Sequence, residues 1–473
     1  MRVIAAAIVL RVCSGVESAG EQLGEALAEF GQFGCAGAAQ LAQHLFDVPG
    51  HATAPAQCAE SDLRRTVLPN GLTVLSESMP GVRSVAFGAW VRAASLHESP
   101  EKMGVSHLLE HMVFKGTPTR SAREIALALE TLGGSLDAYT AREHTSYQAR
   151  VLDEHLPQAA DVLVDLIFRP TLRSADLALE RNVVLEEINT VDDTPDDLVF
   201  ELHNAQLWGA HPYGYSILGT RETVAALSVP DLRNLHSRAY HPDQIVVAAA
   251  GNVEHDALTS VLEASGWADI PSRGLPPLTS PAPFVQAPAA VHVERDTTQT
   301  HIVIGSQAFA HRDPRRYAMS MIGMLLGGGM SSRLFQRIRE ELGLAYSVYA
   351  FQSFHEDAGM HGVYVGTAPE TARAAVDAIN DELEKLSAQG LSESDLAAGK
   401  SQLKGQITLS LESPSSRMYR AAGVELYGEP YRTLDEVLSL VDGIDGAMVA
   451  GICREFYNPS RQTLLSLGPR AAA

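Results

Sequence analysis

The sequence predicts an α+β protein with two similar domains, each a mixed, mainly antiparallel sheet with helices on one face. The order of its segments favours this fold class. Strand-like alternation at 63–75 and 84–92 is followed by long amphipathic segments, and the same order returns in outline after a proline-rich stretch. A chain of 473 residues that is 45% hydrophobic is also long enough to bury two cores.

The first domain is expected over residues 62–270. Its first two strands are joined by the turn signal Pro69-Asn-Gly71, and a third strand covers 84–92. Amphipathic helices are expected at 122–132 and 155–168, because apolar residues recur there with helical spacing. This half therefore supplies both layers of the predicted fold.

Six prolines between 271 and 288 interrupt all periodicity, so residues 271–288 are predicted to be a linker. The second domain is expected over 289–473. Its strands are predicted at 290–294 and 300–306, and a helix at 369–389. Identity between the two halves is too faint to establish a repeat from the residues alone.

Composition narrows the classes of partner. The formal net charge of −21 argues against nucleic acid and anionic membranes. No run of 18 apolar residues occurs, so no membrane span is expected. The apolar start at 3–10 is interrupted by Arg11, which favours a cytoplasmic location, with export by an atypical N-terminal segment as the alternative. Residues 1–61 form an extension without an assigned role.

A candidate metal motif lies between Gly104 and Gly116. His107, Glu110 and His111 have the spacing H-x-x-E-H, and on a helix they share one side, within an arc of roughly 100°. Imidazole nitrogens are good zinc ligands, and a carboxylate beside them can take a proton from the attacking water. A solvated helix face is the alternative for two histidines at this spacing.

Catalytic zinc usually has three protein ligands, so a third is expected elsewhere in the chain. A helix at 174–191, with Ser174 as its N-cap, is the best candidate. Glu180 and Glu187 lie about 20° apart on its wheel, within an apolar stripe where buried carboxylates need a cation to face. Glu186 points about 120° away from Glu180, towards solvent. Glu187 is therefore the predicted third ligand.

Glu180 is predicted to belong to the catalytic site, as a carboxylate that orients a ligand or the substrate. The alternative is an ion pair with Arg150 or another cation at a helix interface. Val183 is expected in the same buried stripe as the two carboxylates, because it falls within about 80° of Glu180 on the wheel.

At these residues the chain resembles the pitrilysin and insulinase family of zinc peptidases, in the half-length branch typified by mitochondrial processing peptidase and its bacterial relatives. His107-Leu-Leu-Glu110-His111 matches the inverted motif, and Glu187 follows His111 by 76 positions, as the third ligand does there. Glu180 falls where the family has its additional carboxylate. Other matching segments are Phe114-Lys-Gly-Thr117, Leu132-Gly-Gly134, Ala138-Tyr-Thr140 and His211-Pro-Tyr-Gly-Tyr-Ser-Ile-Leu-Gly219. The resemblance implies one zinc ion per chain, although cobalt or manganese can use the same donors.

The second half resembles the family's C-terminal half, in Leu326-Gly-Gly-Gly-Met-Ser-Ser-Arg-Leu-Phe335 and Ile338-Arg-Glu-Glu-Leu-Gly-Leu-Ala-Tyr346. By this resemblance Arg339 and Tyr346 reach across a chamber to the scissile peptide, where they hold the carbonyl and stabilise its oxyanion. On the residues alone they are ordinary surface and packing residues. Relatives of this length pair two chains. A homodimer is expected because this chain has both residue sets, and a heterodimer with an inactive sister chain is the alternative.

Residues 134–140 resemble the family's edge strand beside the metal, which binds a peptide as an added strand. Asp137, Ala138 and Tyr139 are therefore predicted to bind substrate. The family often has Asn in place of Asp137, so basic substrates are favoured here, with a solvated carboxylate as the alternative. The predicted function is a zinc-dependent endopeptidase that cleaves unfolded peptides or precursor segments in a closed chamber. A non-catalytic scaffold or peptide-binding subunit is the alternative function.

Overall fold

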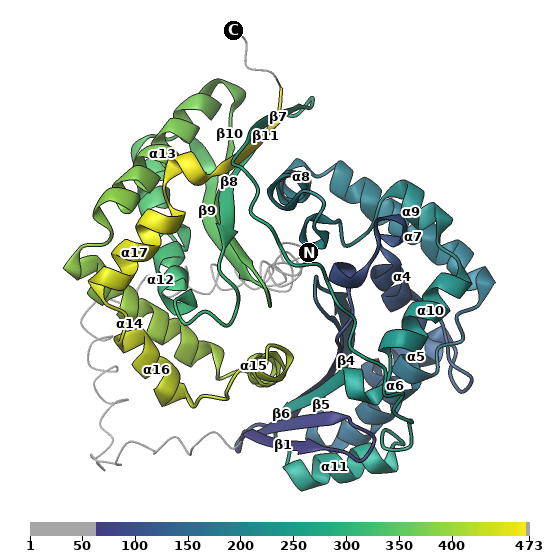
Figure 1. Ribbon diagram of the computed structural model, residues 1–473. Helices are drawn as coiled ribbons and strands as arrows, with labels where there is room; N and C mark the ends of the chain where they lie inside the picture. The colour runs from purple at the N-terminus through teal and green to yellow at the C-terminus, as the bar shows by residue number, and fades with distance from the viewer. Residues whose placement is uncertain (1–62, 470–473) are drawn as a thin grey trace, which may run out of the picture. The chain divides into compact units, whose positions relative to one another are not determined.

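The structure of the chain, a computed structural model, describes residues 63–469 (Figure 1). The extension at 1–61 lies outside the described residues. Residues 61–473 form one compact unit, so the division at 62–270, 271–288 and 289–473 stays a prediction. Among the described helices, none is both long and apolar enough to cross a membrane.

The first sheet has six strands in the order β1-β2-β6-β3-β5-β4. They are β1 (Leu63–Val67), β2 (Thr73–Ser78), β3 (Ser84–Val91), β4 (Ser135–Thr140), β5 (Thr145–Leu152) and β6 (Ile245–Gly251). Strands β2 and β6 are parallel and the other pairs antiparallel, which gives the predicted mixed sheet. The predicted turn joins β1 to β2, with Gly71 at a φ of +87°. Strand β4 is an outer edge, paired only with β5 among the described strands.

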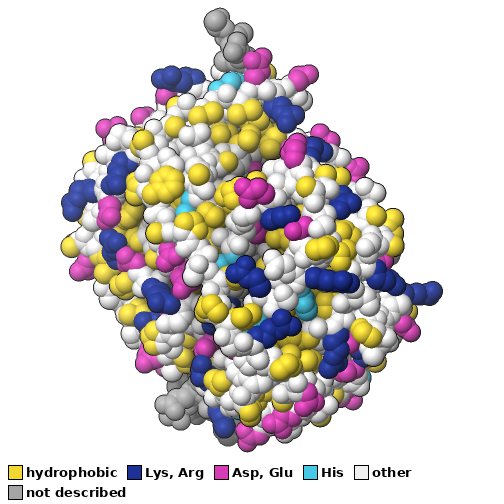
Figure 2. Space-filling model, turned by 45° about the vertical axis from the view of Figure 1, so that its right-hand side comes forward, with side chains coloured by type: hydrophobic (Ala, Val, Ile, Leu, Met, Phe, Trp, Pro, Cys, Tyr) yellow, Lys and Arg dark blue, Asp and Glu magenta, His cyan; other side chains and the backbone are white. Residues whose placement is uncertain are grey.

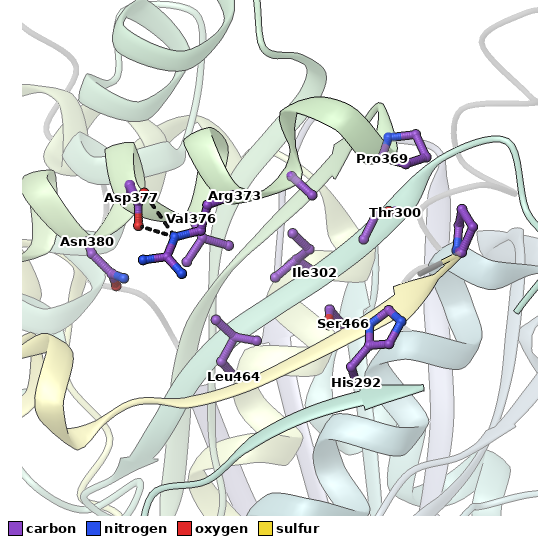
Figure 3. A pocket seen from close by; sticks show the side chains of 12 residues that line it. His292, Thr300, Ile302, Pro369, Arg373, Val376, Asp377, Asn380, Leu464 and Ser466 are labelled. Carbon is purple, nitrogen blue, oxygen red and sulfur yellow. Dashed lines mark hydrogen bonds and ion pairs between the residues drawn. The ribbon is translucent and has the colours of Figure 1, made fainter. Parts of the chain in front are cut away.

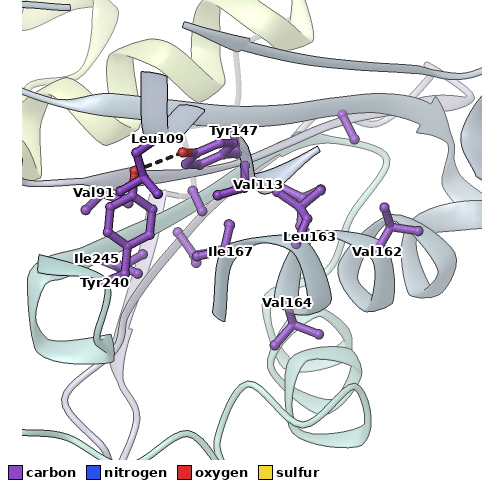
Figure 4. Close-up of a cluster of buried hydrophobic side chains, with 14 of the residues drawn as sticks. Val91, Leu109, Val113, Tyr147, Val162, Leu163, Val164, Ile167, Tyr240 and Ile245 are labelled. Atoms are coloured by element: carbon purple, nitrogen blue, oxygen red, sulfur yellow. Dashed lines mark hydrogen bonds between the residues drawn. The ribbon is translucent and has the colours of Figure 1, made fainter. Parts of the chain in front are cut away.

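The described helices of the same half are α4 (Val105–Val113), α5 (Ala122–Glu130), α6 (Leu156–Phe168), α7 (Ser174–Asp192), α8 (Pro195–Trp208), α9 (Arg221–Ala226), α10 (Val229–Ala239) and α11 (His255–Ala264). Of these, α4, α5, α6 and α11 contact the first sheet directly. Leu109 and Val113 of α4 lie in one core with Leu163 and Ile167 of α6 (Figure 4). Tyr147 of β5 belongs to the same core. The apolar side of α4 is therefore anchored firmly in the interior.

The second sheet has five strands in the order β7-β11-β8-β10-β9. They are β7 (Ala290–Glu294), β8 (Thr300–Ala308), β9 (Ala345–Phe354), β10 (Gly359–Thr367) and β11 (Thr463–Gly468). The helices are α12 (Arg316–Gly327), a π-helix (Phe335–Glu341), α13 (Ala372–Gln389), α14 (Glu393–Ser410), α15 (Pro414–Leu426), α16 (Leu434–Asp442) and α17 (Gly446–Phe456). The proline-rich segment 271–288 contains neither helix nor strand, as predicted.

The two sheets repeat one topology. The order β2-β6-β3-β5-β4 corresponds to β7-β11-β8-β10-β9, and the parallel pair occupies the same place in both sheets. The fold class is thus confirmed. Helix α11 packs on β2 and α6, whereas no described helix follows β11 in the second half. A pocket of about 450 Å³ lies there between the sheet and α13, lined by His292, Ile302 and Leu464 among others (Figure 3).

Each half also contributes one helix that packs on the sheet of the other half. Helix α15 of the second half packs on β2, β3 and β6, on the face opposite the helices of the first half. Helix α8 of the first half packs on β8 and β11. Fully buried Glu77 of β2 pairs with Arg417 of α15 at the first of these contacts. The predicted arrangement, with helices on one face of each sheet, is therefore incomplete, because each sheet is also covered by a helix of the other half.

The acidic side chains do not gather in one patch on the face drawn in Figure 2. Acidic and basic side chains are interspersed there with hydrophobic ones.

Candidate metal centre

The start of α4 is fixed by two contacts. Gly104, at a φ of +87°, lies so close to the loop at Leu218 that a Cβ would come 2.5 Å from the Leu218 carbonyl oxygen. The carboxylate of Glu98 accepts the backbone N–H groups of Gly104 and Ser106, both at 2.8 Å. These are donors that the first turn of a helix cannot satisfy internally. Burial raises the pKa of Glu98 to about 7.

Helix α4 places both predicted histidine ligands on one side. The rings of His107 and His111 have centroids 4.6 Å apart. Burial, with a smaller contribution from His111, lowers the pKa of His107 to about 3, so His107 is held in the neutral form that binds metal. The opposite side of the helix is fully buried through Leu108, Leu109 and Met112.

Helix α7 brings Glu187 to the two rings. Glu187 Oε2 lies 3.6 Å from His107 Nε2, and Glu187 Oε1 lies 3.6 Å from His111 Nε2. Each of the three residues offers one donor atom, and these atoms lie within 4.8 Å of one another, so the three side chains can converge on one zinc ion. Buried Glu187 Oε2 has no hydrogen-bond partner among the described residues, as expected of a donor that faces a cation.

Two details of the α7 prediction are wrong. The N-cap is Arg173, which has extended dihedral angles, and Ser174 is the first helical residue. Val183 is 44% exposed, because α7 is buried through a narrower stripe than the wheel predicts. Leu177, Glu180, Val184 and Ile188 make up this buried stripe. Glu186 is exposed, as predicted.

Glu180 contacts His111, one of the predicted metal ligands, and is not itself one of the three clustered residues. Its Oε2 lies 3.2 Å from His111 Nδ1, and its Oε1 lies 2.7 Å from Lys115 Nζ. The predicted alternative was an ion pair with Arg150 or another cation, and Lys115 forms such an ion pair, whereas none with Arg150 occurs among the described residues. A carboxylate on the second nitrogen of a metal-binding histidine fixes the ring and its tautomer. Sequence reasoning missed Lys115, although it stands four residues after His111.

Glu110 lies beside the two histidines and is buried. Thr140, the last residue of β4, donates its hydroxyl hydrogen to Glu110 Oε2. Burial raises the pKa of Glu110 to about 7, and the charge of Glu187 adds to this effect while the Thr140 hydrogen bond opposes it. A carboxylate with a pKa near neutrality is suited to general-base work. The sequence predicts no separate role for Thr140, which lies in the segment Ala138-Tyr-Thr140 that resembles the family.

Arg339 and Tyr346 lie together, away from this cluster. The Arg339 guanidinium stacks over the Tyr346 ring at 4.2 Å and over the Phe335 ring at 4.8 Å. Tyr346 is 74% exposed. Among the described residues, no hydrogen bond, ion pair or ring contact joins this pair to the three metal donors.

The predicted substrate residues lie on β4 and alternate in direction. Asp137 is exposed, and Tyr139 has its ring centroid 6.3 Å from that of Tyr419 on α15. Ala138 packs against the main core on the other face of the sheet. The strand ends at Thr140, which contacts Glu110, so its free edge leads to the metal cluster.

The fold and this donor set are those of the zinc metallopeptidase class. Residues 73–221 match Insulinase (Peptidase family M16), and residues 226–403 match the Peptidase M16 inactive domain. The chain belongs to the insulinase family, peptidase family M16. The predicted family is thereby confirmed.

Curated relatives carry names of the same kind. The uncharacterized zinc protease YmxG of Bacillus subtilis is 38% identical over 400 residues, which are 84% of this chain and 96% of that protein. The uncharacterized zinc protease SCO5738 of Streptomyces coelicolor is 38% identical over 414 residues, 86% of this chain and 90% of that protein.

Solved structures share the fold. A protease from Helicobacter pylori has a TM-score of 0.82 at 21% identity and covers 87% of this chain and 100% of its own. A peptidase M16 inactive domain from Pseudomonas fluorescens has a TM-score of 0.81 at 20% identity and covers 87% and 99%. At these identities the likeness concerns the fold alone.

Proposed function

We propose that the chain is a zinc-dependent endopeptidase that hydrolyses unfolded peptides or precursor segments held in a closed chamber. The observation that carries the proposal is the pair of 3.6 Å separations between Glu187 and the Nε2 atoms of His107 and His111. These atoms come from two helices far apart in the sequence and leave room for one ion. One zinc ion per chain is therefore proposed, held by these three side chains.

The residues around the ion have distinct roles in the proposal. Zinc supplies Lewis acidity and an activated water when it is bound. Glu110 accepts the proton of the attacking water, and Thr140 holds the Glu110 carboxylate in place. Glu180 orients His111, and Lys115 holds Glu180. The main chain of β4 at Asp137, Ala138 and Tyr139 aligns the peptide as an added strand.

Arg339 and Tyr346 act on the substrate carbonyl of a second copy of the chain in this proposal. Their stacked, exposed arrangement has no contact with the metal donors of the same chain among the described residues. A homodimer in which each copy offers this pair to the other's cluster supplies the missing oxyanion donors. A heterodimer with an inactive sister chain is the competing assembly.

Incubation with a mixture of unstructured peptides tests the activity. The purified chain should cleave internal peptide bonds, a chelator should stop cleavage, and added zinc should restore it. The Glu110→Gln variant should keep its zinc but lose at least about 100-fold in rate, because the general base is gone. Peptide binding without cleavage by the zinc-loaded wild type would indicate the peptide-binding alternative. A near-original rate for Glu110→Gln would show that the mechanism is wrong.

A further inference from the structure

The segment 211–219 resembles the family but has no part in the proposed chemistry. Its last residue lies against the start of α4: a Cβ at Gly219, which has a φ of +81°, would come 2.4 Å from the Met103 carbonyl oxygen. Just beyond the segment, the hydroxyl of Thr223 donates to the same carbonyl oxygen at 2.9 Å. The segment therefore contacts the turn that leads into α4, the helix of the proposed general base Glu110.

The same segment also contacts the turn between β4 and β5, at residues 141–144. Tyr213 donates its hydroxyl hydrogen to Glu143 Oε1 at 2.7 Å. The turn begins directly after Thr140, whose hydroxyl donates to Glu110. This segment therefore joins the end of β4 to the start of α4, and these are the two elements that place the Glu110 carboxylate.

Arg142 anchors the turn at two further points. Its guanidinium Nη1 donates to the Tyr215 carbonyl oxygen at 2.7 Å, and its own carbonyl oxygen accepts the backbone N–H of Leu96 at 2.8 Å. Leu96 stands two residues before Glu98, whose carboxylate holds the first turn of α4. The turn is thus connected to the start of α4 through two separate segments of the chain.

Glu143 extends this connection to the second half of the chain. Its Oε1 also accepts the backbone N–H of Glu356 at 2.8 Å, in the turn between β9 and β10. Its Oε2 accepts the hydroxyl of Tyr427 at 3.0 Å, directly after α15. The Glu143 side chain is only 10% exposed, and burial raises its pKa while these hydrogen bonds oppose the rise. One carboxylate therefore accepts three hydrogen bonds, which come from both halves of the chain.

We propose that Glu143 is a positioning residue for peptide hydrolysis: it holds the β4–β5 turn so that Thr140 stays within hydrogen-bond distance of Glu110. The inference rests on the proposed function and adds a residue that lies outside the metal cluster. Residues 141–144 lie beyond the last ladder pair, Thr140 with Thr145, so strand pairing alone does not fix them. Misplacement of a group beside the reacting atoms by about 1 Å can cost about 100-fold in rate.

Steady-state kinetics of two variants tests this role. Glu143→Ala removes all three acceptor contacts and should lower kcat about tenfold with KM within about twofold, because the residues of β4 that bind the peptide stay paired with β5. Glu143→Gln should keep most of the kcat. Its amide oxygen can accept from Tyr213 and Glu356, and its amide nitrogen can donate to the Tyr427 hydroxyl oxygen. Equal losses in the two variants would overturn the proposal, since charge rather than hydrogen bonding would then be responsible.

A double-mutant cycle shows whether Glu143 acts through Thr140. Thr140→Val removes the hydroxyl that contacts Glu110 and should itself lower kcat about tenfold. Adding Glu143→Ala to Thr140→Val should then lower kcat by no more than about a further twofold, because the contact that Glu143 supports is already lost. Independent effects would multiply to about 100-fold in the double variant, and that result would overturn the proposal.

Glu425→Gln is a matched control, because it weakens another contact between the two halves. The Glu425 carboxylate accepts two hydrogen bonds from the Arg65 guanidinium, at 2.8 and 2.9 Å, and does not touch the β4–β5 turn. This variant should keep kcat within about twofold of wild type. A loss as large as that of Glu143→Ala would assign the effect to the contact between the halves in general and would overturn the proposal.

Hydrogen exchange separates this proposal from the proposed activity. In zinc-loaded protein the amide of Ala141, which donates to the His144 carbonyl oxygen at 2.9 Å, should exchange about tenfold faster in Glu143→Ala than in wild type. Glu143→Gln and Glu425→Gln should exchange there as wild type does. A wild type that cleaves no peptide, with this exchange pattern intact, would contradict the peptidase and leave the anchored turn standing. Unchanged exchange at Ala141 in Glu143→Ala would overturn the positioning role alone.

Discussion

Glu98 and Ser106 are joined across the start of α4, the helix of the proposed metal ligands His107 and His111: the backbone N–H of Ser106 donates to the Glu98 carboxylate at 2.8 Å. The second carboxylate oxygen accepts from Gly104 at the same distance. Ser106 directly precedes His107, so this contact fixes the turn of α4 that carries one of the metal donors. Glu98 thus positions the metal cluster without touching it.

Replacing Glu98 by Gln should change how stability depends on pH. Burial raises the folded-state pKa of Glu98 to about 7 from its ordinary 4.5. Between these values the folded chain holds a proton that the unfolded chain has released, so this group's contribution to stability falls as the pH rises. The free energy of unfolding of wild type minus that of Glu98→Gln should therefore fall by roughly 3 kcal/mol from about pH 4 to about pH 8.

Urea unfolding of chelator-treated protein at stepped pH measures this difference. Glu101→Gln is a matched control, because Glu101 lies exposed in the 3-10 helix Pro100–Lys102, between Glu98 and α4. Its difference from wild type should change little over this range. A Glu98→Gln difference that stays constant with pH would mean that Glu98 is not buried as the structure has it.

Substitutions of the adjacent α7 residues Glu186 and Glu187 should differ sharply in their effect on zinc affinity. Glu187→Gln removes a metal donor and should weaken zinc binding by more than about 100-fold. Glu186→Gln changes an exposed neighbour whose carboxylate contacts Asn189, and should leave zinc affinity unchanged. Competition with a chromophoric chelator measures both affinities. Equal zinc affinity of the two variants would remove Glu187 from the ligand set.

The chain of contacts from Lys115 through Glu180 to His111 should tune zinc affinity in steps. Glu180→Gln weakens the hydrogen bond that orients His111, and a loss of roughly 10- to 100-fold in zinc affinity is expected. Lys115→Met frees one Glu180 oxygen and should cost less. Lys102→Met breaks a comparable ion pair with Asp231 just before α4 and should cost nothing. Chelator competition would contradict this order if Lys115→Met matched Lys102→Met.

Mixing two inactive variants tests whether sites are completed between copies. Glu110→Gln and Tyr346→Phe should each be slow alone. In a mixed homodimer one of the two sites combines an intact Glu110 with the other copy's intact Tyr346, so a mixture should recover about a quarter of wild-type activity. Co-refolded and unmixed samples at equal concentration provide the comparison. No recovery in mixtures shown to exchange subunits would place both residues in one chain's site.

The sequence was sufficient for the features that depend on local periodicity. The placement of His107, Glu110 and His111 on one side of α4 follows from residues within four positions of one another, and the structure has a helix there. The wheel of α7 separated Glu187 from Glu186 because a helix turns by a fixed angle per residue. The wheel wrongly predicted that Val183 is buried, because the width of a buried stripe depends on the neighbouring helices rather than on the helix itself.

Contacts between distant segments were beyond the sequence. Thr140 meets Glu110 across 30 positions, and no local pattern indicates this pair. The sequence predicted that Glu180 orients a ligand or the substrate, but it did not specify His111, 69 positions earlier, as the partner. Glu98 stood outside the predicted motif, although its acidic side chain shortly before a helix start is a recognisable capping signal. The sequence also does not predict that α15 packs on the first sheet, because the apolar face of a helix does not specify which sheet it covers.

The exchange of α8 and α15 makes the two halves dependent on each other for their solubility. Without α15 the first sheet would expose Leu75, Ala248 and Ala250, and Glu77 would be left as a lone charge in an apolar surface. The second sheet loses its cover in the same way when α8 is absent. A single nick in the segment at 271–288 should therefore leave two fragments that stay bound together, and neither half by itself would have a complete interior.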